Sequence, residues 1–132
     1  MAFYLDTSAL VKLVAVERET PSLHAWAVEP GRVLVACDLA RTELIRAVRR
    51  VRADLAVEAR DVLDTLTLLK VTTSVFEAAG RLDPDGLRTL DAVHLAAALA
   101  LGDDLEAVVT YDQRLAEACR LNGVAVLAPG AR

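Results

Sequence analysis

Short, mostly apolar runs alternate with helix-like segments along the whole chain, and this alternation constrains the fold more than any other feature. The runs cover residues 2–5, 33–36, 66–71, 107–111 and 124–128, and each is too short for a helix. Such runs are typical of strands buried on both faces of a parallel sheet, with helices connecting them. We therefore predict an α/β fold: a single domain over residues 1–132, with a central parallel sheet of about five short strands covered by helices on both faces.

The segments between the strands carry start and stop signals for helices. Predicted helices begin near residues 8, 20, 38, 53, 74, 90 and 112. Thr20, Asp38 and Ser74 are the predicted N-caps of three of them, and Ser74 belongs to a capping box of the form S-x-x-E. Residues 90–101 are apolar all round, which predicts a helix buried inside the domain and ended by Gly102.

The composition limits the kinds of protein to which this chain can belong. With 132 residues and 55% hydrophobic content, the chain is long enough for one core. No apolar run approaches the roughly 18 residues that span a bilayer, and the N-terminus has no signal-peptide pattern, so we expect a soluble, cytoplasmic protein with no membrane partner. Cys37 and Cys119 are isolated, which predicts reduced core residues and argues against a structural zinc site.

Four acidic residues follow strands or lie in helices that can meet at one edge of the sheet. Asp6 and Asp112 directly follow predicted strands, and ligands bind at the carboxyl ends of strands where the strand order reverses. Asp91 opens the buried helix, and Glu43 lies at the rim of the apolar face of the helix over 38–51. Each has a plainer interpretation: the three aspartates as helix caps, and Glu43 as a solvated surface residue.

A cluster of these four acids requires a neutralising cation. Two carboxylates about 5 Å apart repel each other by roughly 3 kcal/mol at an effective dielectric constant of 20. A set of oxygen ligands suits Mg²⁺ or Mn²⁺, which activate water and neutralise charge in phosphodiester hydrolysis. Ser8 and Thr110 add hydroxyl groups suited to orienting a carboxylate, a water molecule or a phosphate.

Four segments together resemble one family. They are YLDTSALVKL at 4–13, TELIRAV around Glu43, LDAVHLAAALALG at 90–102 and TYDQRLAEACRLNGV at 110–124. In order and spacing they are similar to the PIN-domain nucleases, and most closely to the VapC-type toxins of bacterial toxin–antitoxin pairs. The likeness covers nearly the whole chain.

The resemblance implies a PIN-like fold and a Mg²⁺- or Mn²⁺-dependent endoribonuclease, active as a homodimer and held inactive by a cognate antitoxin. By position it implies catalytic and metal-binding roles for Asp6, Glu43, Asp91 and Asp112, with Ser8 and Thr110 as supporting hydroxyls. We expect an antitoxin segment to bind an apolar groove formed by the helices over 8–16 and 38–65.

Two further features bear on the RNA substrate and the site. Five arginines concentrate positive charge near Glu43, namely Arg41, Arg46, Arg49, Arg50 and Arg52. Of these, Arg46, Arg49 and Arg50 are the candidates for RNA binding, although a solubilising helix face explains them equally well. We interpret His94, on the apolar helix, as a core histidine with one satisfied hydrogen bond and leave it outside the site.

Other functions remain open at this stage. A phosphatase of the haloacid dehalogenase type needs a second aspartate two residues after the first and a downstream lysine. This chain has Ser8 at that position, and its only later lysine is Lys70. A receiver domain is disfavoured for similar reasons, because this chain has no paired acids before the aspartate that follows its first strand and no lysine near its end. A non-catalytic RNA- or protein-binding PIN-like module, whose acids only cap helices, is the alternative outside the enzymes.

Overall fold

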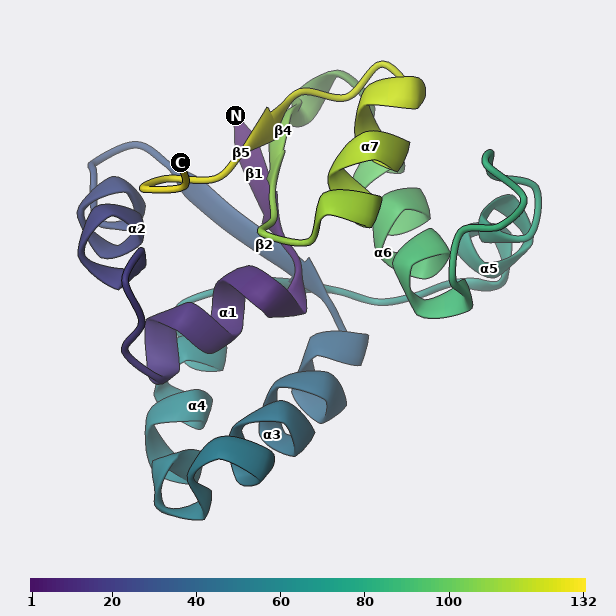
Figure 1. The fold of residues 1–132 in the computed structure, drawn as a ribbon. Helices are drawn as coiled ribbons and strands as arrows, with labels where there is room; N and C mark the ends of the chain where they lie inside the picture. Colours follow the sequence, from purple (N-terminus) through teal and green to yellow (C-terminus); the bar gives the residue numbers. More distant parts are fainter.

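A parallel sheet of five strands runs through the middle of the molecule (Figure 1). The computed structural model describes all residues, Met1–Arg132. The strands are β1 (Ala2–Leu5), β2 (Val33–Cys37), β3 (Thr67–Leu69), β4 (Leu105–Val109) and β5 (Val126–Leu127). Every neighbouring pair is parallel, so the predicted sheet is confirmed.

The strand order is β3-β2-β1-β4-β5, and the order reverses between β1 and β4. From β1 the chain moves outward through β2 and β3, then returns to build β4 and β5 on the other side. In sheets of this kind the crevice at the reversal, outside the carboxyl ends of the strands, is the usual place for a ligand. Asp6 follows β1 there, and Asp112 lies three residues after β4.

Helices cover both faces of the sheet, as predicted (Figure 1). Their bounds are α1 (Thr7–Val14), α2 (Thr20–Ala27), α3 (Leu39–Val51), α4 (Ala56–Asp64), α5 (Thr73–Ala79), α6 (Thr89–Leu99) and α7 (Gln113–Leu121). Short 3-10 turns precede α4 at Ala53–Leu55 and β4 at Gly102–Asp104. No helix combines the length and apolar character that crossing a membrane requires.

The core consists of two layers separated by the sheet. One layer packs α5, α6 and α7 against Tyr4 and Cys37, and the other packs α1, α2, α3 and α4 against Leu5 and Ala36. Because successive side chains in a strand point to opposite faces, Tyr4 and Leu5 belong to different layers. This two-sided burial explains why the strands are apolar almost without interruption.

Helix α6 is buried nearly all round, as its sequence predicts. Residues 92–98 are all buried, His94 among them, and α6 packs against the sheet and against the helices α5 and α7. Cys37 and Cys119 are buried free cysteines in the same layer, which confirms their predicted place in the core.

Two of the three predicted N-caps are wrong, and the third, Asp38, holds the N-cap position without a capping hydrogen bond. Helix α5 is capped by Thr72, whose hydroxyl accepts from the Val75 amide at 3.4 Å, and Ser74 lies inside the first turn. Thr72 has the extended backbone (φ −88°, ψ 167°) that lets a side chain reach back to a free amide. Asp38 already has helical backbone angles and makes no capping hydrogen bond.

The second wrong N-cap is Thr20, and the end of α6 also differs from the prediction. Glu19, not Thr20, precedes α2, and the Thr20 hydroxyl instead donates to the Lys12 carbonyl at 2.6 Å. Helix α6 ends at Leu99, and Gly102 (φ +59°) turns the chain into the following 3-10 segment instead of capping the helix. Strand β4 also ends earlier than predicted, so Thr110 lies just beyond it.

Candidate active site

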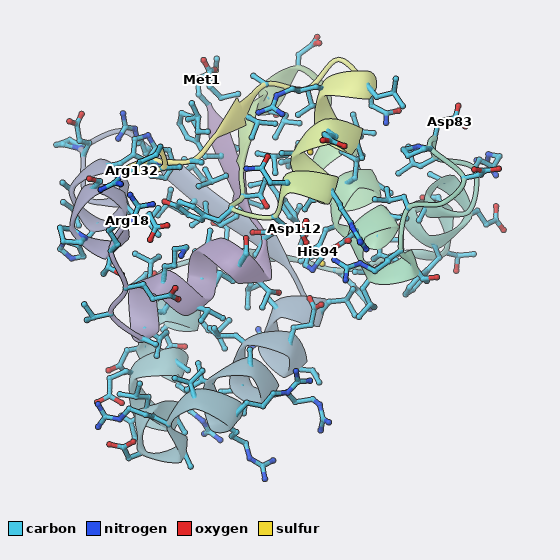
Figure 2. All side chains as sticks on the ribbon, in the orientation of Figure 1. Met1, Arg18, Asp83, His94, Asp112 and Arg132 are labelled. Atoms are coloured by element: carbon cyan, nitrogen blue, oxygen red, sulfur yellow. The ribbon has the colours of Figure 1, made fainter.

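The candidate residues gather where the carboxyl ends of β1 and β4 meet the starts of four helices. Asp6 and Asp112 are the N-cap residues of α1 and α7. Asp91 lies in the first turn of α6, and Glu43 in the second turn of α3. Figure 2 shows the labelled Asp112 and His94 in this central region, where α1, α3, α6 and α7 approach one another.

Asp6 is the most enclosed of the four acids, with 4% of its surface exposed. Its Oδ1 accepts from the Ser8 hydroxyl at 2.6 Å and from the Ala9 amide at 3.1 Å, and its Oδ2 accepts from the Thr110 hydroxyl at 2.7 Å. The amide contact makes Asp6 a true helix cap. The two hydroxyls, from opposite ends of the sequence, hold the carboxylate in one orientation.

Burial raises the pKa of Asp6 above its usual value, and the hydrogen bonds from Ser8, Thr110 and Ala9 counteract part of this rise. These donors carry no net charge. The fold therefore places a buried carboxylate among oriented dipoles without an ion pair of its own, and the charge of His94 gives it a small further stabilisation.

Glu43 reaches from α3 toward the start of α1. Its Oε1 accepts from the Thr7 hydroxyl at 3.0 Å and contacts Nε2 of His94 at 2.5 Å, while its Oε2 has no protein donor. Its side chain is 21% exposed. Burial acts to raise the pKa of Glu43, but its bonds to His94 and Thr7 outweigh burial and lower it.

His94 is buried as predicted, but it makes more than the one predicted hydrogen bond. Its Nε2 meets Glu43, and its Nδ1 lies 2.7 Å from the Tyr4 hydroxyl and 3.8 Å from Cys37 Sγ. Burial alone would lower the pKa of His94, but the contacts with Cys37 and Glu43 raise it to about 10. The ring is therefore an imidazolium paired with a carboxylate.

A single arginine joins the other two acids. Arg88 Nε lies 3.2 Å from Asp91 Oδ2, and Arg88 Nη2 lies 3.0 Å from Asp112 Oδ2. Burial and the nearby charge of Asp112 raise the pKa of Asp91, and Arg88 counteracts this only in part. Asp112 Oδ1 meanwhile accepts from the Arg114 and Leu115 amides, which caps α7.

The donor chemistry fits a hard cation, although the side chains do not stand as a ready-made metal site. No three acidic, histidine or cysteine side chains are grouped so that they could hold one ion. However, Glu43 Oε2 and Asp91 Oδ1 accept no protein hydrogen bond, and every candidate ligand atom is a carboxylate oxygen. Oxygen atoms of this kind are the ligands that Mg²⁺ and Mn²⁺ select.

The arginines near Glu43 divide into two groups. Arg41 pairs with Asp38 at 3.5 Å, and Arg52 pairs with Asp54. The remaining three make no ion pair and together line a surface hollow of about 260 Å³ on α3; these are Arg46, Arg49 and Arg50. The three unpaired arginines are the same three that the sequence singles out for RNA contact.

Thr7, Arg88 and the Glu43 contact of His94 are parts of the site that were not predicted from the sequence. Arg88 precedes Asp91 by three residues, a spacing that brings side chains together on a helix, so its ion pair had a detectable signal. Thr7 and His94 lie 36 and 51 residues from Glu43 in sequence, and no local pattern reports such contacts.

Comparison with known proteins finds one matching family and relatives that share one name. The profile of the PIN domain family matches residues 3–121. Ribonuclease VapC47 of Mycobacterium tuberculosis is 42% identical over 132 residues, which is 97% of both chains. Ribonuclease VapC46 of the same species is 42% identical over 128 residues, covering 97% of this chain and 98% of its own.

Solved structures share the fold. M. tuberculosis VapC20, described as a Sarcin-Ricin loop cleaving toxin, superposes with a TM-score of 0.76 at 20% identity, over 96% of this chain and 99% of its own. VapBC2 from Rickettsia felis, bound to a DNA fragment from its promoter, gives a TM-score of 0.72 at 15% identity, over 96% and 98%.

Proposed function

The chain belongs to the PIN domain family, and on this premise we propose that it is a Mg²⁺-dependent endoribonuclease that acts as the toxin of a toxin–antitoxin pair. The observation that carries the proposal is the gathering of four carboxylates from α1, α3, α6 and α7 at the reversal point of the sheet. Two relatives at 42% identity are named ribonucleases, which supports the same reaction. Mn²⁺ suits the same oxygen ligands.

Asp6, Glu43, Asp91 and Asp112 are the residues that would hold the cation. A bound Mg²⁺ supplies positive charge that stabilises the phosphate in the transition state and makes water a stronger nucleophile. Ser8 and Thr110 keep the Asp6 carboxylate in place through their hydroxyl groups. Thr7 and His94 do the same for Glu43.

RNA contact is proposed for the three unpaired arginines of α3. Arg46, Arg49 and Arg50 present positive charge on the helix that also carries Glu43, so a phosphate backbone bound there runs toward the acids. Each lost phosphate contact lowers the salt dependence of binding by a measurable amount. Replacing all three arginines with glutamine should therefore weaken RNA binding and flatten its salt dependence.

An antitoxin partner is proposed for the face formed by α1, α2 and α4, which shares α1 and α4 with the groove expected from the sequence but has α2 in place of α3. A hollow of about 430 Å³ there includes Leu13, Val28, Leu34 and Val62 among its lining residues. Val28 is 61% exposed, and polar side chains complete the lining, so this mixed groove suits an amphipathic partner helix. Homodimer formation is proposed from the resemblance alone.

The proposal is tested by cleavage of RNA with and without a divalent metal. Purified protein should cleave RNA in Mg²⁺ or Mn²⁺, stop in EDTA and recover when metal is restored. Asp6→Asn, purified in the same way, controls for contaminating nucleases because it should be inactive. Cleavage by wild type that continues unchanged in EDTA, with Asp6→Asn inactive, would contradict the metal requirement.

The toxin role is tested separately in cells. Expression of the wild-type chain should arrest growth, and coexpression of the small protein encoded beside it should relieve the arrest. Normal growth with abundant folded protein would contradict the toxin role while leaving the nuclease intact.

One observation favours a second candidate, a non-catalytic RNA-binding module. Arg88 already neutralises Asp91 and Asp112, and no three side chains are grouped to hold an ion. Such a module would bind RNA through α3 with equal affinity in Mg²⁺ and EDTA and would leave the RNA intact.

A further inference from the structure

We propose that His94 is a positioning residue that fixes the Glu43 carboxylate at the cleft by tying it to the core of the sheet. The inference rests on the proposed function, because it assigns to His94 the support of a carboxylate that would hold the metal. It assigns no direct contact between His94 and RNA or metal.

The first step is the way His94 is held. Its side chain is 3% exposed, and both ring nitrogens have partners. Nδ1 lies 2.7 Å from the hydroxyl of Tyr4, a residue of β1 with no exposed surface. The two rings meet edge to face, with centroids 5.8 Å apart. Packing and hydrogen bonding therefore leave the imidazole one orientation.

The second step is where the contact lies in the fold. Glu43 belongs to α3, on one face of the sheet, and His94 belongs to α6, on the other. Their side chains meet at 2.5 Å beyond the carboxyl ends of the strands. This contact links two helical layers that the sheet separates, so it transmits the rigid position of α6 to a long side chain on α3.

The third step is which oxygen the contact uses. Both Thr7 and His94 contact Oε1 of Glu43, and Oε2 has no protein donor. Two contacts on one oxygen set the plane and direction of the carboxylate and leave the second oxygen available. Partners that orient a ligand in this way typically contribute about 10–100-fold to metal affinity or activity.

A matched pair of substitutions separates the two contacts of the ring. In His94→Gln the amide nitrogen takes a place near Nε2 and can still donate to Glu43. In His94→Asn the shorter amide replaces Nδ1 and keeps the Tyr4 side, but cannot reach Glu43. Both variants are polar and similar in size, so a loss of packing affects them alike.

The expected result is a difference between these two variants. His94→Asn should weaken Mn²⁺ binding, measured by titration calorimetry, by about 10–100-fold and lower kcat to a similar extent, with KM for RNA nearly unchanged. His94→Gln should stay within about five-fold of wild type in each measurement, below that range. Equal Mn²⁺ affinities for Asn, Gln and wild type, with all three folded, would overturn the inference.

A double-mutant cycle with Glu43→Gln shows whether His94 acts through Glu43. In the Glu43→Gln background, adding His94→Asn should cause no further loss of Mn²⁺ affinity. A full additional loss would overturn the inference. If both His94 variants fail to fold, Tyr4→Phe replaces them. It should weaken Mn²⁺ binding less than ten-fold through loss of the anchor, and an unchanged affinity there would equally overturn the inference.

The outcomes also distinguish this inference from the proposed function. If wild type neither binds Mn²⁺ nor cleaves RNA, the proposed function fails, and the inference fails with it. If wild type does both and His94→Asn is indistinguishable from it, only the role of His94 is contradicted.

Discussion

The candidate site has two halves that are held in different ways. We name the buried half for its donors: Asp6 and Glu43 accept hydrogen bonds from hydroxyls, a backbone amide and an imidazole that are buried or half-buried. The acids themselves do not divide in this way, because the Glu43 side chain is 21% exposed and that of Asp91 is 16% exposed. In the open half, Asp91 and Asp112 are joined by Arg88, whose side chain is 61% exposed. The buried half has several fixed donors, whereas in the open half the two acids share one exposed cation and only Asp112 also has fixed donors, the amides of Arg114 and Leu115.

This difference gives the two halves separate roles: one fixes the position of a bound ligand, and the other can exchange Arg88 for that ligand. Buried and half-buried donors keep Asp6 and Glu43 in position whether or not a ligand is present. An ion pair on the surface contributes only about 0–1 kcal/mol, so an incoming cation or a basic side chain can replace Arg88 at little cost. The buried half therefore sets the position of a ligand, and the open half adapts to it.

The largest effect is expected from removing the charge of Asp6 in the buried half. Asp6→Asn keeps the capping ability of residue 6 but removes its charge, and Asn caps a helix about as well as Asp. We expect RNA cleavage to fall by more than about 100-fold, beyond the range typical for loss of an outer-shell partner. The unfolding free energy should change by less than about 1 kcal/mol.

Cleavage assays and urea unfolding on the same preparation test this prediction. Asp91→Asn in the open half should lose cleavage to a similar degree, since the ligand needs both halves. Asp6→Asn that cleaves RNA at the wild-type rate would show that the acid is only a helix cap.

A smaller effect of opposite sign is expected from the open half. Arg88→Gln removes the cation that competes for Asp91 and Asp112, so Mn²⁺ should bind up to about five-fold more tightly, the equivalent of about 1 kcal/mol. Titration calorimetry measures this change. Arg114→Gln, at a nearby arginine without an ion pair, is the matched control and should change the affinity less. Weaker Mn²⁺ binding by Arg88→Gln would mean that Arg88 orients the acids for the metal.

A change of pH should affect Asp6 and Glu43 in opposite directions. Burial raises the pKa of Asp6 in the folded state, so its contribution to stability is full below the unfolded value of 3.8 and is lost as pH rises through the folded pKa. The pKa of Glu43 is lowered by His94 and Thr7, although burial opposes this, so its contribution is present above the unfolded value of 4.5 and is lost as pH falls.

Urea unfolding of the metal-free protein at about pH 3.5 and about pH 5.5 measures both, because His94 stays protonated in the folded and unfolded states below its unfolded value of 6.5. The stability of Asp6→Asn relative to wild type should increase between these values. The stability of Glu43→Gln relative to wild type should decrease over the same interval. A parallel response of the two variants would contradict the opposite pKa shifts.

The sequence was sufficient to predict the fold because the signals are repeated along the chain. Five apolar runs separated by helices define a parallel sheet with two covered faces, and α6 is apolar on every side. The N-caps were predicted less well. Ser74 and Thr72 are both good capping residues, and only the backbone angles, which depend on the preceding strand and loop, determine that Thr72 is the cap.

The site was predictable at its backbone positions but not in its contacts. The edge at which Asp6 and Asp112 emerge follows from the strand order, which a parallel α/β pattern predicts. The network of Glu43, His94 and Tyr4 does not follow from it, because it joins three elements from both faces of the sheet. An apolar helix predicts that His94 is buried but says nothing of its partner.

The smallest effect is expected at Asp38, which tests whether position at this edge is sufficient for a role. Asp38 follows β2 as Asp6 follows β1, and it precedes a helix in the same way. It makes no capping hydrogen bond, its side chain is 46% exposed, and its one ion pair is with Arg41. Asp38→Asn should therefore change the unfolding free energy by less than about 0.5 kcal/mol and leave cleavage unaltered.

Melting temperature and RNA cleavage measured beside Asp6→Asn make the comparison direct. A large loss of RNA cleavage in Asp38→Asn would show that any carboxylate at this edge contributes. Unchanged cleavage in Asp38→Asn together with lost cleavage in Asp6→Asn would show that the role of Asp6 depends on its burial and its fixed donors.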